Sequence, residues 1–458
     1  MVTPARDEAS PQVLVQGPLV VVEDLPSHRK GGWPHLFLGY RRCLLDDVWP
    51  WRLRGLGGRS GPRPTCNKKN ENDQNSGLQG VDLDSFRPHY TSHERARKGP
   101  WGPIQQGFVV GSDSVGVGEM PDAAQYGDRG ANTLAHTAEA VGGVRLPNMG
   151  RLGLGNVTDV RGVAKTASPD GHFGRMAEAS VGKDTTTGHW EMAGVILDQP
   201  FAVFTDTGFP PELMEAFRRE SGFDWIGNYA ASGTEIIARL GPEHQRTGKL
   251  IVYTSADSVF QVAAHEETVP LERLYEACKV ARRLADQYRI ARVIARPFVG
   301  TEGAYKRTYN RKDFSMEPPK ATVLDLLTAA SVPVVGVGKI HDIFAGRGLG
   351  ESIHTEGNSD GLVKTEEALL RLGRGLVFTN LVDFDMVYGH RRDPRGYAQA
   401  LEEVDAFLPR LIAALGPTGL LLITADHGCD PTATWSTDHT REYVPLLVWH
   451  QGIKPGSG

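Results

Sequence analysis

Two Asp-His pairs near the end of the chain are the residues best suited to carry chemistry. Asp426 and His427 follow an apolar run, Leu420-Leu-Leu-Ile-Thr, and Asp438 and His439 come shortly afterwards. The run has the composition of a buried strand, and α/β enzymes place their chemistry at the ends of such strands. Carboxylates and imidazoles are ligands of divalent metal ions. The segment therefore predicts a metalloenzyme.

Two further segments carry candidate ligands at predicted strand ends. Asp113 follows a short apolar run, and Asp383, Asp385 and His390 lie at the end of a later one. A lone Asp or His is usually structural, but several at successive strand ends favour a metal site. Asp383 and Asp385 would share one strand face, so the pattern does not choose between them. Oxygen and nitrogen ligands in this number suit two neighbouring ions, which could be Mn, Fe, Co or Zn.

A Gly-flanked turn rich in hydroxyl groups is the best candidate for a nucleophile, and it reads Gly182-Lys-Asp-Thr-Thr-Thr-Gly-His-Trp. Two metal ions can clamp the attacking and leaving oxygens of a phosphoryl transfer. Coordination to a metal ion also lowers the pKa of a hydroxyl and activates it. The alternative is an ordinary Ser/Thr-rich turn or helix cap. The metal ligands elsewhere in the chain favour the nucleophile.

The composition indicates an ordinary globular protein of more than one domain. The chain has 458 residues, 40% hydrophobic and 23% charged, and a net charge of -5, which argues against a general nucleic-acid binder. Four widely spaced cysteines form no CxxC pair, so we expect a reducing compartment and no thiolate metal site. No apolar run approaches the ~20 residues of a membrane span. These features predict a cytoplasmic protein that does not bind membranes.

Residues 1–106 differ from the rest of the chain. They hold half of the tryptophans, many Pro and Arg residues, and a polar stretch at 67–76. Neither a helical nor a strand period is sustained there. We expect a disordered or artefactual extension, and the alternative is a basic, Trp-containing binding segment.

From about residue 107 the pattern is that of an α/β fold. An amphipathic helix is predicted at 271–288 and further helices from Thr322 and at 401–415. Apolar strands are predicted at 292–298, 332–337, 376–385, 420–424 and 444–449. This alternation predicts a mostly parallel sheet sandwiched by helices.

Taken together, these segments resemble the phosphopentomutases of the alkaline phosphatase superfamily. The resemblance covers nearly all of residues 107–450. It is carried by Asp113-Ser-Val-Gly-Val-Gly-Glu-Met-Pro-Asp, Pro147-Asn-Met-Gly-Arg, Gly182-Lys-Asp-Thr-Thr-Thr-Gly-His-Trp-Glu, Arg296-Pro-Phe-Val-Gly, Asn380-Leu-Val-Asp-Phe-Asp-Met-Val-Tyr-Gly-His and Ala425-Asp-His-Gly-Cys-Asp-Pro-Thr. It implies a phosphatase-like core (107–200 and 317–458) with an inserted α/β cap (201–316).

The resemblance also implies an activity and its cofactors. The expected reaction interconverts ribose 1-phosphate and ribose 5-phosphate, and the deoxyribose pair, in nucleoside catabolism. It implies two Mn²⁺ ions, with other divalent metals possible, and a sugar bisphosphate activator such as glucose 1,6-bisphosphate. Its expected partner is a small phosphosugar, and it leaves the oligomeric state open.

Roles for single residues follow from the same resemblance. It assigns one ion to Asp113, Asp426 and His427 and the other to Asp385, His390 and His439. It makes Thr185 the phosphorylated nucleophile, and Asp438 a supporting partner rather than a ligand. For the substrate it suggests polar residues of the cap and one later lysine, with exposed surface residues as the alternative: Ser255, Asp257, Arg307, Arg311 and Lys339.

Departures from the family pattern lie at both ends. Gly111 and Ser112 stand where relatives have apolar strand residues, so we expect the strand that leads into Asp113 to be weak. Relatives are also expected to continue past the position of Gly458. The alternatives to a phosphopentomutase are a cofactor-independent phosphoglycerate mutase or hydrolase of the same superfamily, and a non-catalytic phosphosugar- or metal-binding relic.

Overall fold

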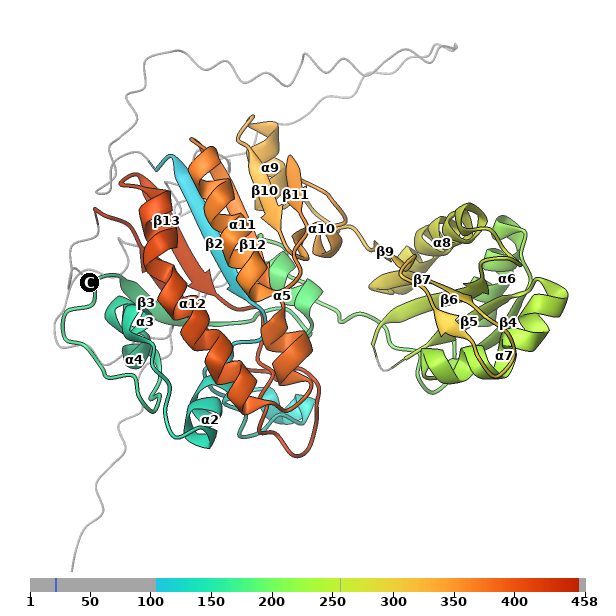
Figure 1. Cartoon of the computed structure of the whole chain (residues 1–458), viewed down its shortest axis with the longest axis horizontal. Coiled ribbons are helices and arrows are strands. Elements are labelled where there is room, and N and C mark those ends of the chain that lie inside the picture. The colour runs from blue at the N-terminus through green and yellow to red at the C-terminus, as the bar shows by residue number, and fades with distance from the viewer. Residues whose placement is uncertain (1–20, 23–103, 256, 453–458) are drawn as a thin grey trace, which may run out of the picture. The chain divides into compact units, whose positions relative to one another are not determined.

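The computed structural model describes residues 21–22, 104–255 and 257–452 (Figure 1). The extension predicted at 1–106 lies almost entirely outside these residues. The described residues form two sheets with their helices.

The larger sheet has eight strands, and its central part is parallel. The five strands β13, β2, β12, β10 and β11 run parallel to one another, whereas β14 is antiparallel to both β13 and β3. The order across the sheet is β1 (Val21–Val22), β3 (His172–Ala177), β14 (Val444–Trp449), β13 (Gly419–Thr424), β2 (Gln106–Ser112), β12 (Gly375–Leu381), β10 (Val334–Val337) and β11 (Glu351–Ile353). The α/β class predicted from the sequence is confirmed.

Helices cover both faces of this sheet. Consecutive strand residues point to opposite faces, and Val377 and Phe378 of β12 accordingly enter two different hydrophobic clusters. In Figure 1, α11 and α12 lie side by side over the first face, while α5, α9 and α10 contribute to the cluster on the other. The helices are η3 (Ala123–Tyr126), α2 (Thr133–Ala140), α3 (Pro147–Leu152), α4 (Leu154–Val157), α5 (Thr185–Met192), α9 (Val323–Ala329), α10 (Ile340–Ile343), α11 (Asn358–Arg371), η5 (Phe384–Gly389) and α12 (Pro394–Leu415).

The strand that leads into Asp113, which the sequence predicted to be weak, is paired along its length. β2 pairs with β12 through Ser112 and with β13 through Gly111. A Cβ atom at Gly111 would lie 3.4 Å from Nε2 of His189 and 3.5 Å from the carbonyl oxygen of Thr379. These are ordinary van der Waals distances, and pairing on both sides supplies the order that the missing side chain does not.

The strand predicted at 376–385 ends earlier than expected. β12 stops at Leu381, and Phe384–Gly389 forms a single π-helical turn, η5. Asp383 therefore does not share a strand face with Asp385. Its carboxylate accepts a hydrogen bond from the backbone N–H of Asn358 at 2.7 Å, whereas Asp385 is buried.

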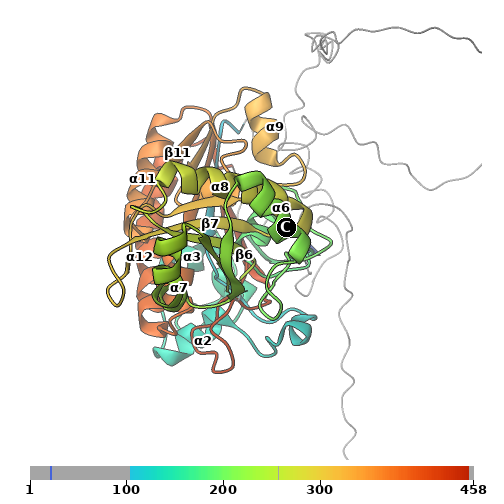
Figure 2. The same ribbon diagram turned by 90° about the vertical axis from the view of Figure 1, so that its right-hand side faces the viewer.

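The smaller sheet is built from residues between 225 and 315. Its order is β4 (Trp225–Ala230), β5 (Leu250–Thr254), β6 (Val259–His265), β7 (Arg292–Val299) and β8 (Lys306–Arg307), with β9 (Lys312–Ser315) also paired to β7. Figure 2 shows α6 (Pro211–Ser221) and α8 (Leu271–Ala285) together, with η4 (Asp286–Tyr288) continuing α8. The apolar residues of α6 and α8 share one hydrophobic cluster. Those of α7 (Gly233–Thr247) form another cluster with the opposite face of the smaller sheet.

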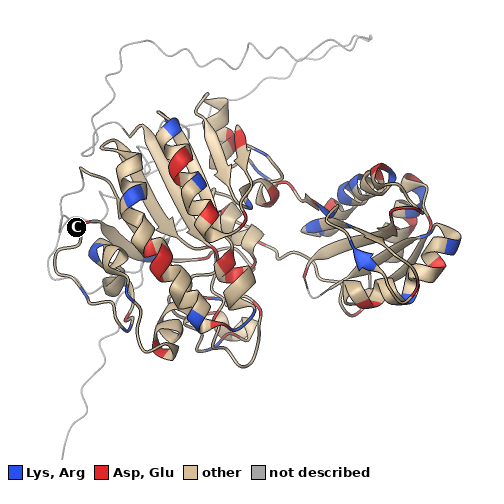
Figure 3. Cartoon of the chain, in the orientation of Figure 1, with Lys and Arg blue, Asp and Glu red and all other residues tan. Residues whose placement is uncertain are grey.

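Charged residues are mixed in sign on the outer helices. Figure 3 shows blue and red segments interspersed along α8, α11 and α12, which is typical of solvated helix faces. Among the described residues, no helix combines the length and the apolar character needed to cross a membrane.

Candidate metal centre

The carboxyl ends of three adjacent parallel strands bring the predicted ligands together. Asp113 follows β2, Asp426 follows β13, and Asp385 lies on η5, just after β12. Because β2 lies between β13 and β12, and all three run parallel, their carboxyl ends meet at one edge of the sheet. The side chains of Asp113, Asp385 and Asp426 are all buried there.

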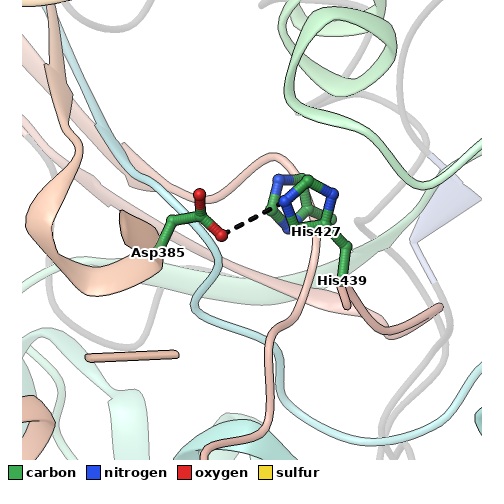
Figure 4. Close-up of side chains that lie close together, drawn as sticks. All are labelled: Asp385, His427 and His439. Carbon is green, nitrogen blue, oxygen red and sulfur yellow. Dashed lines mark ion pairs between the residues drawn. The ribbon is translucent and has the colours of Figure 1, made fainter. Parts of the chain in front are cut away.

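Asp385 is the centre of one group of ligands. Its Oδ1 atom lies 3.2 Å from Nε2 of His439 and 3.3 Å from Nε2 of His390 (Figure 4 draws the first contact). His390 donates from Nδ1 to the carbonyl oxygen of Thr437 at 2.6 Å. That hydrogen bond leaves Nε2 as the coordinating atom of His390, directed at Asp385.

His427 is the centre of a second group. Its Nε2 atom lies 3.3 Å from Oδ2 of Asp426, 3.9 Å from Oδ1 of Asp113 and 3.3 Å from the hydroxyl of Thr185. The His427 ring stacks on the His439 ring with 3.9 Å between centroids, as the close-up of Figure 4 shows. The two groups are therefore contiguous, and Asp385, His427 and His439 are themselves close enough to hold one ion.

Several ligand atoms in this centre are buried and make no hydrogen bond among the described residues, although some of them lie at ion-pair distance from one another. They are both carboxylate oxygens of Asp113, Oδ1 of Asp385, Oδ2 of Asp426 and Nε2 of His439. A buried polar atom without a partner is costly. Divalent cations would satisfy these atoms and neutralise the buried carboxylates, so the residues present fit the metal ions that the sequence predicts.

The pKa shifts of the candidate ligands also indicate a metal site. Burial raises the pKa of Asp113 well above its ordinary value, and the nearby Asp426 carboxylate raises it further. Burial opposes ionisation of Asp385 too, but His439 and His390 outweigh it and lower its pKa. The contact with Asp385 raises the pKa of His390 to about 11. Asp113 and His390 thus favour their protonated forms, and a metal ion bound by them would displace those protons.

Cys429 lies beside this centre, although the sequence predicted no thiolate ligand. Its sulfur is 3.9 Å from Nδ1 of His390 and 3.8 Å from the carbonyl oxygen of Asp438. Burial raises the pKa of this thiol. Spacing could not identify Cys429, because it stands alone in the sequence and reaches the site only through the fold.

Thr185 is the first residue of α5, and its neighbours hold the helix start in place. Asp184 caps the helix, because its Oδ1 atom accepts from the backbone N–H of Thr187 at 3.1 Å. Thr185 itself is half-buried, and its hydroxyl faces His427. One turn later, Gly188 packs directly on the backbone that precedes His427. The helix start is thus fixed against the metal-binding loop.

Replacing Gly188 by alanine should impair activity. The added Cβ would lie 2.4 Å from the carbonyl oxygen of Asp426, so α5 or the loop must move. We expect a loss of about 1–3 kcal/mol in the free energy of unfolding and at least ~10-fold in turnover. Gly373→Ala is the control, since nothing lies within 4 Å of its Cβ. Equal activity of the two variants, measured with urea unfolding in parallel, would contradict the close packing.

Arg441 forms a buried ionic network that sequence reasoning missed. Its guanidinium donates to Oε2 of Glu178 at 2.7 Å and to the carbonyl oxygen of Gly182 at 2.6 Å. Only 4% of its side chain is exposed. Arg441 follows His439 closely and Gly182 precedes Thr185, so one side chain ties the metal-binding loop to the nucleophile turn.

Lys183 makes a parallel connection. Its ammonium lies 3.0 Å from Asp128, which is buried, and 3.5 Å from Asp438. Asp438 thus contacts the nucleophile turn, and it is absent from the groups that could hold an ion among the described residues.

The predicted substrate residues are spread over several elements. Arg307 lies on β8, which is blue in Figure 3, and Arg311 precedes β9 and pairs with Asp313 at 2.7 Å. Their positive charges lower the pKa of Arg296 on β7, after the larger effect of its burial. We refer to Arg296, Arg307 and Arg311 as the arginine cluster. Arg296 belonged to a recognised motif but had no predicted role.

The other three substrate candidates lie elsewhere. Ser255 and Asp257 follow β5, and Asp257 lies 3.7 Å from Arg292 rather than in the arginine cluster. Lys339 lies between β10 and α10 and is half-buried.

Comparison with known proteins identifies the family of this chain. The family model of the metalloenzyme superfamily matches residues 105–457. A phosphopentomutase of Anaeromyxobacter sp. (strain K) is 63% identical over 345 residues, which are 75% of this chain and 88% of the relative. The phosphopentomutases of Thermotoga petrophila (60% over 345 residues, 75% and 88%) and Kosmotoga olearia (56% over 349 residues, 76% and 89%) are similar at comparable coverage. The chain therefore belongs to the phosphopentomutase family, whose members are phosphomutase isomerases within the metalloenzyme superfamily.

Proposed function

We propose that this protein interconverts ribose 1-phosphate and ribose 5-phosphate, and the corresponding 2-deoxyribose phosphates, through a phosphorylated Thr185. The observation that carries the proposal is the Thr185 hydroxyl, 3.3 Å from Nε2 of His427 and at the edge of a cluster of buried, unpartnered carboxylate oxygens. Membership of the phosphopentomutase family supports the choice of pentose phosphates as substrates.

Two Mn²⁺ ions are the proposed cofactors. Asp113, Asp426 and His427 would hold one, and Asp385, His390 and His439 the other, with His427 and Asp385 near both. When bound, such ions lower the pKa of a coordinated hydroxyl and neutralise charge on the transferring phosphoryl group. The two carboxylate oxygens of Asp113 are the strongest support, because both are buried without a hydrogen bond, which is costly unless a cation satisfies them.

The chain's own residues supply position and charge. The first turn of α5 presents the Thr185 hydroxyl and, beside it, backbone N–H groups, which favour a phosphate at a helix N-terminus. Phosphothreonine would give its phosphoryl group to the free oxygen of the sugar phosphate and form a sugar bisphosphate. The hydroxyl of Thr185 would then recover the other phosphate. Most of the catalysis comes from alignment of the reacting oxygens.

Residues 201–316 are proposed to form a cap that keeps water from the phosphoenzyme. Their arginine cluster, with Arg307 and Arg311, suits the distal phosphate of a bisphosphate, because guanidinium groups bind phosphate in a bidentate manner. Ser255 and Asp257 are proposed to contact sugar hydroxyls, and Lys339 the phosphate. A bisphosphate such as glucose 1,6-bisphosphate would prime the enzyme. The proposed cellular role is nucleoside catabolism in the cytoplasm.

The function is tested by supplying ribose 1-phosphate with Mn²⁺ and glucose 1,6-bisphosphate. We expect ribose 5-phosphate to form with little free phosphate, and we expect EDTA to abolish the reaction until Mn²⁺ is restored. Predominant release of phosphate would indicate a hydrolase. Faster turnover of 2-phosphoglycerate than of ribose 1-phosphate would favour a phosphoglycerate mutase.

Removal of residues 1–105 should leave the activity unchanged. All proposed ligands and Thr185 lie after this segment, and the core strand β2 begins at Gln106. Of the described strands the removal takes only β1, a two-residue strand at the edge of the sheet. The measurement is the turnover of ribose 1-phosphate by the full chain and by a variant that begins at Gln106. A loss of more than ~10-fold in the shortened variant, if it is folded, would show that the segment contributes to the enzyme.

A further inference from the structure

His189 is a fully buried residue of α5 for which the proposed mechanism has no use. It lies one turn after Thr185, and none of its side chain is exposed. Its ring stacks on Phe378 of the central strand β12, with 5.8 Å between centroids and 23° between planes. The histidine is thus held rigidly between the nucleophile helix and the sheet that carries the metal ligands.

The neighbours of His189 determine which ring nitrogen carries the proton. Nδ1 lies 2.9 Å from the carbonyl oxygen of Thr185, which can only accept, so Nδ1 donates. Nε2 lies 3.2 Å from the side-chain nitrogen of Asn380, which donates to it. Both nitrogens are therefore engaged.

This arrangement argues against His189 as a metal ligand. Together with Asp113 and Asp426 it forms a group whose ligand atoms lie within 4.8 Å of one another. A ligating nitrogen must present a lone pair to the ion. Nδ1 carries a proton, and the lone pair of Nε2 is directed at Asn380, so the ring has none to offer.

The same Nδ1 atom also lies 3.1 Å from Oδ2 of Asp426. The other oxygen of that carboxylate, Oδ1, accepts from the backbone N–H groups of Ser114 at 2.9 Å and His427 at 3.1 Å. The backbone therefore holds one oxygen, and His189 faces the one that is left for a metal ion. The Nδ1–H group donates to the nucleophile's carbonyl and lies in close polar contact, without a hydrogen bond, with the ligand's free oxygen.

We infer that His189 is a positioning residue whose Nδ1–H group keeps the Thr185 turn and the Asp426 carboxylate in a fixed mutual orientation. The inference rests on the proposed function, in which Thr185 is the nucleophile and Asp426 a metal ligand. A histidine that orients a ligating carboxylate acts on metal affinity as well as on rate, because such supporting contacts typically change either by about 10–100-fold.

Three substitutions separate this role from simple packing. In His189→Asn the amide nitrogen can take the place of Nδ1, and in His189→Gln it can take the place of Nε2. His189→Leu keeps the bulk and loses both donors. The first measurement is calorimetric titration of the metal-free protein with Mn²⁺, which does not depend on activity. The second is kcat and KM for ribose 1-phosphate.

We expect the Gln and Leu variants to bind one of the two Mn²⁺ ions ~10–100-fold more weakly and to lose kcat, with KM unchanged. The Asn variant should stay within about fivefold of the wild type in both Mn²⁺ affinity and kcat. Equal losses in the Asn and Gln variants, or unchanged Mn²⁺ affinity in the Gln variant, would overturn the inference. If the Leu variant does not fold, the comparison of the Asn and Gln variants still tests the inference.

Failure of the proposed function gives a different result. In that case wild-type protein does not isomerise ribose 1-phosphate at all, whereas the calorimetric comparison of the variants remains measurable.

Discussion

Replacing Thr185 by alanine should lower the rate of isomerisation by at least ~10³-fold while both metal ions remain bound. The lost hydroxyl is the atom proposed to carry the phosphoryl group, and enzymes that lose their nucleophile retain only a small part of their rate enhancement. The fold should survive, because Asp184 rather than Thr185 caps α5. The rate is measured with ribose 1-phosphate, and Mn²⁺ binding by calorimetry.

Thr186→Ala is the matched control. Thr186 is the next residue of α5, is also half-buried, and loses the same atoms on substitution. Mass spectrometry of protein treated with glucose 1,6-bisphosphate should find phosphothreonine at position 185 in the wild type and the control. An active Thr185→Ala variant, or a control that is equally inactive, would remove Thr185 from the mechanism.

Replacing Arg441 by methionine should destabilise the protein by about 3–5 kcal/mol, since breaking a buried ion pair from one side leaves the other charge uncompensated. Arg441 pairs with Asp122, which is partly exposed, and with Glu178, which is the more buried of the two carboxylates. Burial raises the pKa of Glu178 well above its ordinary value and Arg441 lowers it, so loss of Arg441 further disfavours the ionised form of Glu178. The substitution also removes the donor to the carbonyl oxygen of Gly182, so the nucleophile turn should lose its position and turnover should fall. The free energy of unfolding is measured with urea.

Arg410→Met provides the comparison at an exposed ion pair. Arg410 pairs with Glu366 on the neighbouring helix, and its side chain is 58% exposed. Exposed pairs of this kind contribute only about 0–1 kcal/mol. The double substitution of Arg441→Met with Glu178→Gln should recover part of the loss, because it removes the unpaired charge. If Arg441→Met costs no more than Arg410→Met, the buried network does not support the site.

Local pattern predicted several of the regular elements but missed others, among them α7, α11 and β6. The helix expected at 271–288 is α8 with η4, and the strand expected at 420–424 is β13, because periodicity and apolar runs report burial directly. The pattern failed at 382–385, where an apolar run continues past the end of β12. There the chain turns into η5, which buries Phe384 and Asp385 together. An apolar run records burial, and it cannot tell a strand from a helical turn.

The sequence by itself predicted the chemistry of the site, because carboxylates and imidazoles at successive strand ends favour a metal ion. It also identified the hydroxyl-rich turn that holds Thr185. Local pattern alone did not distinguish Asp385 from Asp383, and the family resemblance selected Asp385. The tertiary structure gives the physical reason, since their separation depends on where β12 ends. It alone brought His189 and Arg441 to the nucleophile turn, because these contacts join segments far apart in the chain, and no local pattern encodes them.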